Sequence, residues 1–149
     1  KPVVTGFGGH GLTSRGTCGV PPANDAFPYV YDKVEWKPAV KPLVVVIYHG
    51  TNDAVPPLAF QACYETYLAT IRKAYPSATI FAVCPHNRTD YAAAIRNAVG
   101  AVNDKRILFL DCSSGVISTD ETCDGCHLNP GGAVALAIRL AGDMRSRLA

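Results

Sequence analysis

Three continuous runs of apolar, mostly β-branched or aromatic residues constrain the fold of this chain more than any other feature. They span residues 43–48, 78–83 and 107–110. None of them alternates apolar with polar residues, and continuous runs of this kind are typical of strands covered on both faces of a parallel sheet. A shorter run at residues 3–5 is a fourth candidate strand. The sequence therefore predicts a buried parallel sheet.

The segments between these runs carry helix signals. A helix is predicted to start near Pro57 and to stop before Pro76, because proline cannot continue a helix. Asp90 is a suitable N-cap for a second helix. Asn129 followed by a proline begins a third, which is predicted to end near Leu148. Strands that alternate with helices indicate an α/β fold with right-handed connections.

Each predicted helix has an apolar face with helical spacing. The inward positions are Phe60, Tyr64, Tyr67, Leu68, Ile71 and Tyr75 in the first helix, Tyr91, Ile95 and Val99 in the second, and Ala133, Leu136, Ala137, Leu140 and Met144 in the last.

Length and composition exclude several classes of protein. The 149 residues suit a single domain, and 48% hydrophobic with 17% charged residues is typical of a globular chain. A net charge of +2 without a lysine or arginine run argues against a nucleic-acid partner. No apolar stretch approaches the roughly 20 residues that span a bilayer, so no membrane partner is expected. Residues 6–40 are rich in glycine and proline and are interpreted as a functional surface segment.

The residues that follow each strand are candidates for chemistry, because ligands of α/β sheets gather at the carboxyl ends of the strands. Residues 50–53 (Gly-Thr-Asn-Asp) follow the run at residues 43–48, and the Asn52 amide could donate to developing negative charge. The glycine-rich residues 6–11 could bring backbone N–H groups close to a ligand. Asp124 could orient His127 as a general base. Ordinary turn chemistry explains residues 6–11 and 50–53 equally well, and a surface histidine in a polar loop is the alternative for Asp124 and His127.

Six cysteines, at positions 18, 63, 84, 112, 123 and 126, favour disulfides and an oxidising compartment. A secreted or periplasmic location is therefore expected, with buried free thiols as the alternative. Cys123, Cys126 and His127 form a Cys-x-x-Cys-His pattern that also fits c-type haem attachment or part of a zinc site. The predicted strands and the inward Met144 argue against haem, so a Cys123–Cys126 disulfide is the preferred interpretation. A Cys84–Cys112 disulfide is also open.

Taken together, these motifs resemble the SGNH/GDSL hydrolases. Residues 50–53 are similar to the third block of that family, residues 124–130 to the fifth, and residues 7–11 to the second. The match covers essentially the whole chain, in order and spacing. Residues 19–36 also resemble the carbohydrate-deacetylating branch of the family.

The resemblance implies a flavodoxin-like three-layer sandwich with strand order 2-1-3-4-5. It implies that Gly9 N–H, with Gly8 as the alternative, forms an oxyanion hole with Asn52, and that His127 is a base held by Asp124. On the same grounds we expect His10, Asp53 and Trp36 to bind substrate. The resemblance implies neither a metal nor an organic cofactor.

One family feature is missing from the sequence. No Gly-Asp-Ser motif occurs, and the serines stand at positions 14, 77, 113, 114, 118 and 146. Residues 1–149 are therefore expected to be the C-terminal portion of an SGNH hydrolase-like domain that lacks its first strand, with an N-terminal segment as the partner that carries the nucleophile. Ser14 is the rival nucleophile.

The expected function is hydrolysis of small acyl esters, such as acetyl groups on carbohydrate. The alternatives are a non-catalytic binding module of the same fold, and a haem or metal protein that uses Cys123, Cys126 and His127.

Overall fold

A three-stranded parallel sheet forms the centre of the molecule. The computed structural model describes residues 2–27, 29–31, 34–35, 39–115 and 117–149. The strands are β3 (Val44–Ile47), β4 (Thr79–Cys84) and β5 (Ile107–Asp111), in the order β3-β4-β5. All three lie where the apolar runs predicted them. Because the strands are parallel, their carboxyl ends and the loops that follow share one edge.

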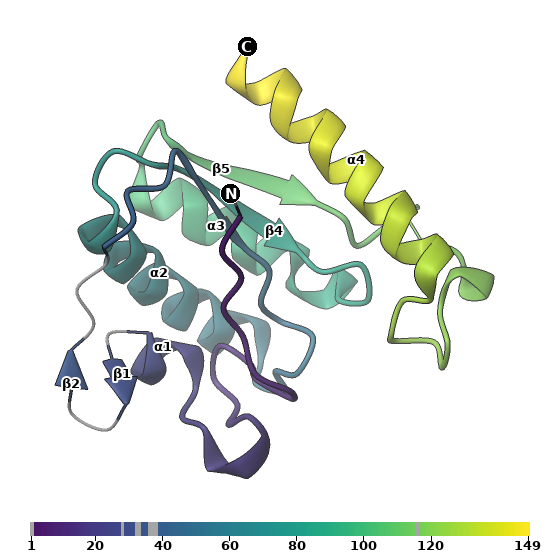
Figure 1. The fold of residues 1–149 in the computed structure, drawn as a ribbon, viewed down its shortest axis with the longest axis horizontal. Helices are drawn as coiled ribbons and strands as arrows, with labels where there is room; N and C mark the ends of the chain where they lie inside the picture. The colour runs from purple at the N-terminus through teal and green to yellow at the C-terminus, as the bar shows by residue number, and fades with distance from the viewer. Residues whose placement is uncertain (1, 28, 32–33, 36–38, 116) are drawn as a thin grey trace.

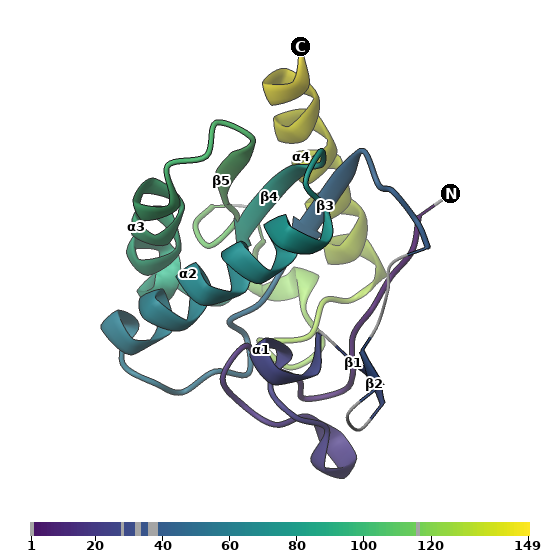
Figure 2. The ribbon, with the colours of Figure 1, turned by 90° about the vertical axis from the view of Figure 1, so that its left-hand side faces the viewer.

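Helices cover both faces of this sheet and form the predicted three layers (Figure 1). Helices α2 (Pro57–Ala74) and α3 (Ala92–Val102) lie together on one face, and α4 (Pro130–Leu148) lies on the other, as Figure 2 shows. The predicted α/β fold class is thereby confirmed.

The core divides into two parts, one on each side of the sheet. The larger part packs α2 and α3 against the sheet, and the rings of Phe60 and Tyr91 stack there with centroids 4.0 Å apart. The smaller part lies under α4 and centres on Phe81, Val83 and Leu136. Burial of each large side chain contributes about 1.5–3 kcal/mol, so packing of the apolar faces stabilises these helices far more than intrinsic propensity does.

The predicted helix ends agree with the structure except at one position. Helix α2 begins at Pro57 and ends before Pro76, and Asn129 caps α4 by accepting a hydrogen bond from Gly132 N–H. Asp90 does not cap α3, contrary to the prediction. It lies inside the 3₁₀ turn η2 (Thr89–Tyr91), where its carboxylate pairs with Arg88 at 2.8 Å.

Two predictions about apolar residues are wrong. Residues 3–5 form no strand. In a flavodoxin-like order another strand would lie between them and β3, so among the described residues they have no adjacent strand to bond with. Ala133 and Ala137 of α4 are exposed rather than inward. Both departures leave apolar side chains in solvent.

The segment before β3 folds into small elements. They are the 3₁₀ turn η1 (Thr17–Gly19), the short helix α1 (Ala23–Ala26), and the strands β1 (Tyr29–Tyr31) and β2 (Val34–Glu35), which pair antiparallel. One more 3₁₀ turn, η3 (Thr119–Glu121), precedes α4. In the described part of the chain, no helix combines the length and apolar character that crossing a membrane requires.

Candidate active site

Asp124 and His127 form a hydrogen-bonded pair in the loop before α4. The Asp124 Oδ2 to His127 Nδ1 distance is 2.7 Å, and Asp124 Oδ1 accepts from His127 N–H at 2.7 Å and from Cys126 N–H at 3.0 Å. These bonds, the His127 backbone bond first, lower the pKa of Asp124 to about 2. The carboxylate is therefore ionised at neutral pH, and a hydrogen bond to it favours the imidazole tautomer with its proton on Nδ1 and its acceptor on Nε2.

The Gly9 turn lies against Asn52, as an oxyanion hole would require. Gly9 has a φ of +67°, a left-handed conformation that favours glycine, and its N–H bonds to no group in the described part of the chain. Asn52 Nδ2 donates to the His10 carbonyl at 3.2 Å. An amide NH₂ carries two hydrogens, so Asn52 keeps one for a ligand.

Hydrogen bonds connect these two parts across the carboxyl edge of the sheet. Thr51 Oγ1 donates to Asn87 Oδ1 at 3.1 Å, and Asn87 Nδ2 donates to Cys126 Sγ at 3.1 Å. His86 Nε2 lies 2.9 Å from the Cys126 carbonyl. The loop with His127 therefore lies beside the loops that follow β3 and β4. Among the described residues no hydrogen bond joins His127 to Asn52 directly, and their convergence on one pocket stays a prediction.

His10 and His49 line a hollow of about 380 Å³ between residues 4–7 and the end of β3. Their rings meet edge to face at 5.7 Å. His10 Nε2 donates to the Pro21 carbonyl, while Nδ1 is buried and bonds to no group in the described part of the chain. Burial and then the neighbouring His10 lower the pKa of His49 to about 4, so this imidazole is neutral at pH 7.

Asp53 anchors a turn and does not line this hollow. It is 3% exposed, and its carboxylate accepts from Leu12 N–H at 2.9 Å and from both the N–H and the hydroxyl of Thr13 at 2.6 Å. A carboxylate occupied in this way fixes the position of the Gly9 turn relative to β3. Trp36, the third predicted substrate-binding residue, lies outside the described residues.

Sequence reasoning missed Arg88, which holds the turn that carries Asn52. One guanidinium nitrogen donates to the carbonyls of Gly50, Thr51 and Asp53, and the guanidinium also lies 3.9 Å from the centroid of the Tyr91 ring. Its place just after the apolar run at residues 78–83 is a positional signal, but no motif distinguishes Arg88 from a surface arginine.

His86 and Tyr48 were also missed. The Tyr48 hydroxyl donates to His86 Nδ1 at 2.8 Å, and His86 Nε2–H donates to the Cys126 carbonyl. This arrangement fits one neutral tautomer of His86 and couples the end of β3 to the His127 loop.

The cysteines differ from the prediction. All six lie within the described part of the chain and are free thiols, so neither the Cys123–Cys126 nor the Cys84–Cys112 disulfide is present. Backbone bonds close the His127 loop instead, including Cys123 N–H to the His127 carbonyl at 2.7 Å. Across the described residues no three His, Cys, Asp or Glu side chains are grouped as metal ligands would be.

No described serine is hydrogen-bonded to His127. Ser113 is bound to Asp111, Ser118 to Glu121 and Ser146 to the Asp143 carbonyl. Ser14 lies in the turn after Gly11, where its carbonyl accepts a backbone bond. The described residues therefore contain the hydrogen-bonded Asp124–His127 pair without a serine bonded to it.

The fold is similar to that of two solved carbohydrate esterases. One is a family two carbohydrate esterase from Clostridium thermocellum in complex with cellohexaose, with a TM-score of 0.74, 23% identity, and coverage of 94% of this chain and 48% of that chain. The other is a family two enzyme with a carbohydrate-binding domain from Corynascus thermopiles (Myceliophthora fergusii), with a TM-score of 0.74, 20% identity, and coverage of 94% and 50%.

The chain thus spans about half the length of both relatives. No protein-family model and no curated protein sequence matches it. At these identities the likeness concerns the fold, and it agrees with the fold that the SGNH/GDSL resemblance implied.

Proposed function

We propose that residues 1–149 form the oxyanion-hole and acid–base portion of an SGNH-type serine esterase domain, and that a separate segment supplies the nucleophilic serine. The observation that carries this proposal is the Asp124–His127 pair, whose loop is hydrogen-bonded to the loops beside the Asn52 turn. Substrates in this proposal are small acyl esters, such as acetyl groups on carbohydrate. The cellohexaose complex of the esterase from Clostridium thermocellum supports that choice.

In the proposed reaction, His127 Nε2 takes the proton of the incoming serine as its oxygen attacks the acyl carbon. Gly9 N–H and the second hydrogen of Asn52 Nδ2 stabilise the oxyanion. His127 then gives the proton to the departing alcohol oxygen, and water hydrolyses the acyl–serine ester with the same base. Asp124 stays ionised throughout and stabilises the imidazolium.

In this proposal the serine segment binds at the open edge of β3. β3 ends the sheet order, and Val46 on it is 45% exposed. The hollow beside it is lined by His10, His49 and Tyr67, and the buried Nδ1 of His10 faces no donor among the described residues. A strand inserted between residues 4–7 and β3 would bury these groups. A domain of this class fits the expected secreted or periplasmic location.

The test compares hydrolysis of 4-nitrophenyl acetate by the isolated chain, by its Ser14→Ala variant, and by a longer polypeptide that includes the serine segment. We expect turnover only in the longer polypeptide, with its loss in His127→Ala. Removal of one triad member typically costs about 10⁴-fold or more. A fluorophosphonate probe should label one serine of the added segment. Turnover by the isolated chain that disappears in Ser14→Ala would contradict the proposal.

A non-catalytic binding module is the second candidate, favoured by the lack of a serine bonded to His127 among the described residues. It predicts that the longer polypeptide binds acetylated oligosaccharide without hydrolysing it. Calorimetry with acetylated cello-oligosaccharide, followed by measurement of released acetate, separates the two functions.

A further inference from the structure

The outer edge of β5 is a second open edge, on the far side of the sheet from β3. Within the ladder, Ile80 N–H donates to the Arg106 carbonyl at 2.8 Å and Cys112 N–H donates to the Cys84 carbonyl at 3.2 Å. The N–H and C=O of a strand residue point to the same side, and successive residues alternate. Even-numbered residues of β5 therefore face β4, and the backbone groups of Phe109 and Asp111 face outward.

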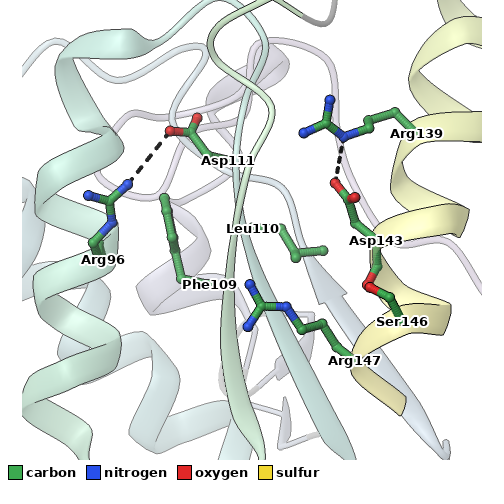
Figure 3. Close-up of a pocket in the computed structure, with 8 residues that line it drawn as sticks. All are labelled: Arg96, Phe109, Leu110, Asp111, Arg139, Asp143, Ser146 and Arg147. Atoms are coloured by element: carbon green, nitrogen blue, oxygen red, sulfur yellow. Dashed lines mark hydrogen bonds and ion pairs between the residues drawn. The ribbon is translucent and has the colours of Figure 1, made fainter. Parts of the chain in front are cut away.

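A hollow of about 430 Å³ lies along this edge between α3 and α4. Figure 3 shows β5 passing between Arg96 of α3 on one side and Arg139 and Arg147 of α4 on the other. Phe109 packs into the core on the α3 side, beneath the Arg96 guanidinium at 4.9 Å, and Leu110 packs on the α4 side. Arginines thus flank both faces of the open edge.

The aspartate partners hold these arginines only weakly, so the arginines can pair with other carboxylates. Arg96 is 3.9 Å from Asp111, and Arg139 is 2.7 Å from Asp143, but both arginine side chains are more than half exposed. Exposed ion pairs contribute only about 0–1 kcal/mol. Arg147 bonds to no side chain in the described part of the structure, and it extends from α4 toward β5 (Figure 3). Three arginines against two aspartates leave the edge net positive.

We propose that an extended acidic segment of a partner protein binds here as an additional strand on β5. Its backbone would pair with the outward N–H and C=O groups of Phe109 and Asp111. Its side chains would alternate between the two faces, so that adjacent carboxylates would meet Arg96 on one face and the α4 arginines on the other. A second copy of this chain is a poorer occupant, because its own arginines would face these.

Fluorescence anisotropy with three labelled peptides tests whether binding needs the carboxylates of the peptide and whether it needs the backbone N–H groups of the peptide. The first has a pair of adjacent glutamates flanked by valine and threonine, the second has glutamine in place of glutamate, and the third is the acidic peptide with alternate amides N-methylated. We expect saturable binding of the first peptide and affinities at least about ten-fold weaker for the other two, because one lacks the charges and the other lacks the donors.

Substitutions in the protein test whether the acidic peptide binds at the β5 edge. Arg96→Glu combined with Arg147→Glu should weaken binding of the acidic peptide by at least about ten-fold. Arg145→Glu on the same helix is the matched control, since Arg145 does not line the hollow, and circular dichroism checks that each variant is folded.

If the N-methylated peptide bound as tightly as the unmodified acidic peptide, strand addition would be overturned. Complete displacement by millimolar inorganic phosphate would assign a small-anion site instead. No saturable binding of the acidic peptide, or equal loss in Arg145→Glu, would also contradict the proposal.

Discussion

At the scale of single residues, the carboxyl edge of the sheet is held together by Arg88, which no motif marks, and by Asp53, which belongs to the motif at residues 50–53. Arg88 binds three carbonyls of the turn that carries Asn52, and Asp53 binds the Gly9 segment from the other side. Hydrogen bonds from a charged group contribute about 1.5–3 kcal/mol each at most. The positions of Gly9 and Asn52 therefore depend on Asp53 within the third block and on Arg88, which lies outside the family blocks.

His49 should make the stability of the chain depend on pH. Its pKa is about 4 in the folded state, because burial and His10 disfavour the cation, whereas an unfolded histidine titrates near 6.5. Between these values the unfolded chain binds more protons, so the free energy of unfolding falls as pH drops from about 6.5 toward 4. From pH 7 to 5 this group should remove roughly 2 kcal/mol.

Urea unfolding of the wild type and of His49→Gln at pH 7 and pH 5 measures this contribution. From pH 7 to pH 5, the free energy of unfolding of His49→Gln should fall by roughly 2 kcal/mol less than that of the wild type. His49→Phe, which keeps an aromatic ring beside Tyr67, serves as a second variant in case glutamine packs poorly. Identical pH dependence in all three proteins would contradict the assignment.

At the scale of elements, α4 is the least firmly packed helix of the three layers. Of its residues, Gly132 and Leu136 are buried, whereas α2 buries five side chains. Its N-terminal end is fixed instead by Asn129, whose Nδ2 donates to the Asp120 carbonyl at 2.7 Å and whose N–H donates to the Glu121 carbonyl at 3.0 Å. Contact with η3 therefore positions the helix and the preceding His127 loop.

Gly132→Ala should disrupt this contact. A β-carbon at Gly132 would lie 2.2 Å from the Glu121 carbonyl oxygen, so η3 or α4 must shift. We expect a loss of about 1–3 kcal/mol in the free energy of unfolding, as is usual for overpacking.

Gly142→Ala is the matched control in the same helix. A β-carbon there meets no atom within 4 Å, so this variant should be about 0.5–1 kcal/mol more stable. Thermal unfolding of both variants gives the comparison. A Gly132→Ala variant as stable as Gly142→Ala would show that α4 is not fixed by η3.

At the scale of the whole molecule, apolar side chains remain in solvent on β3 and on α4. Val46 on β3 and Val134 and Ile138 on α4 are 45%, 59% and 69% exposed. Val46 lies on the same face of the sheet as Val44, which packs under α4. Exposed apolar surface next to an open strand edge favours association with another chain.

The isolated chain is therefore expected to self-associate, and Val46→Lys or Ile138→Lys should reduce this. Sedimentation velocity over a range of concentrations measures the effect. Leu58→Lys is the control, because Leu58 is 78% exposed but lies on α2, away from the β3 edge. Self-association that is unchanged by the first two substitutions, or equally reduced by the third, would contradict this expectation.

The sequence by itself determined the elements of this protein. Continuous apolar runs become β3, β4 and β5 because strands buried on both faces need apolar residues at every position. Pro57, Pro76 and Asn129 determined helix ends because proline and N-cap geometry act locally. Asp124 and His127 are three residues apart, so their hydrogen bond could also be predicted from the sequence.

Only the tertiary structure decided what depends on neighbours distant in the chain. The sequence pattern predicted a strand at residues 3–5 and inward alanines at 133 and 137, but among the described residues no strand pairs with residues 3–5, and α4 packs through Leu136 while both alanines stay exposed. Asp53, expected to bind substrate, is buried because Leu12 and Thr13 reach it from 40 residues away. The roles of Arg88 and of the β5 edge also depend on residues distant in the chain. Long-range hydrogen bonds and burial follow from how the layers pack, and local propensity does not encode that packing.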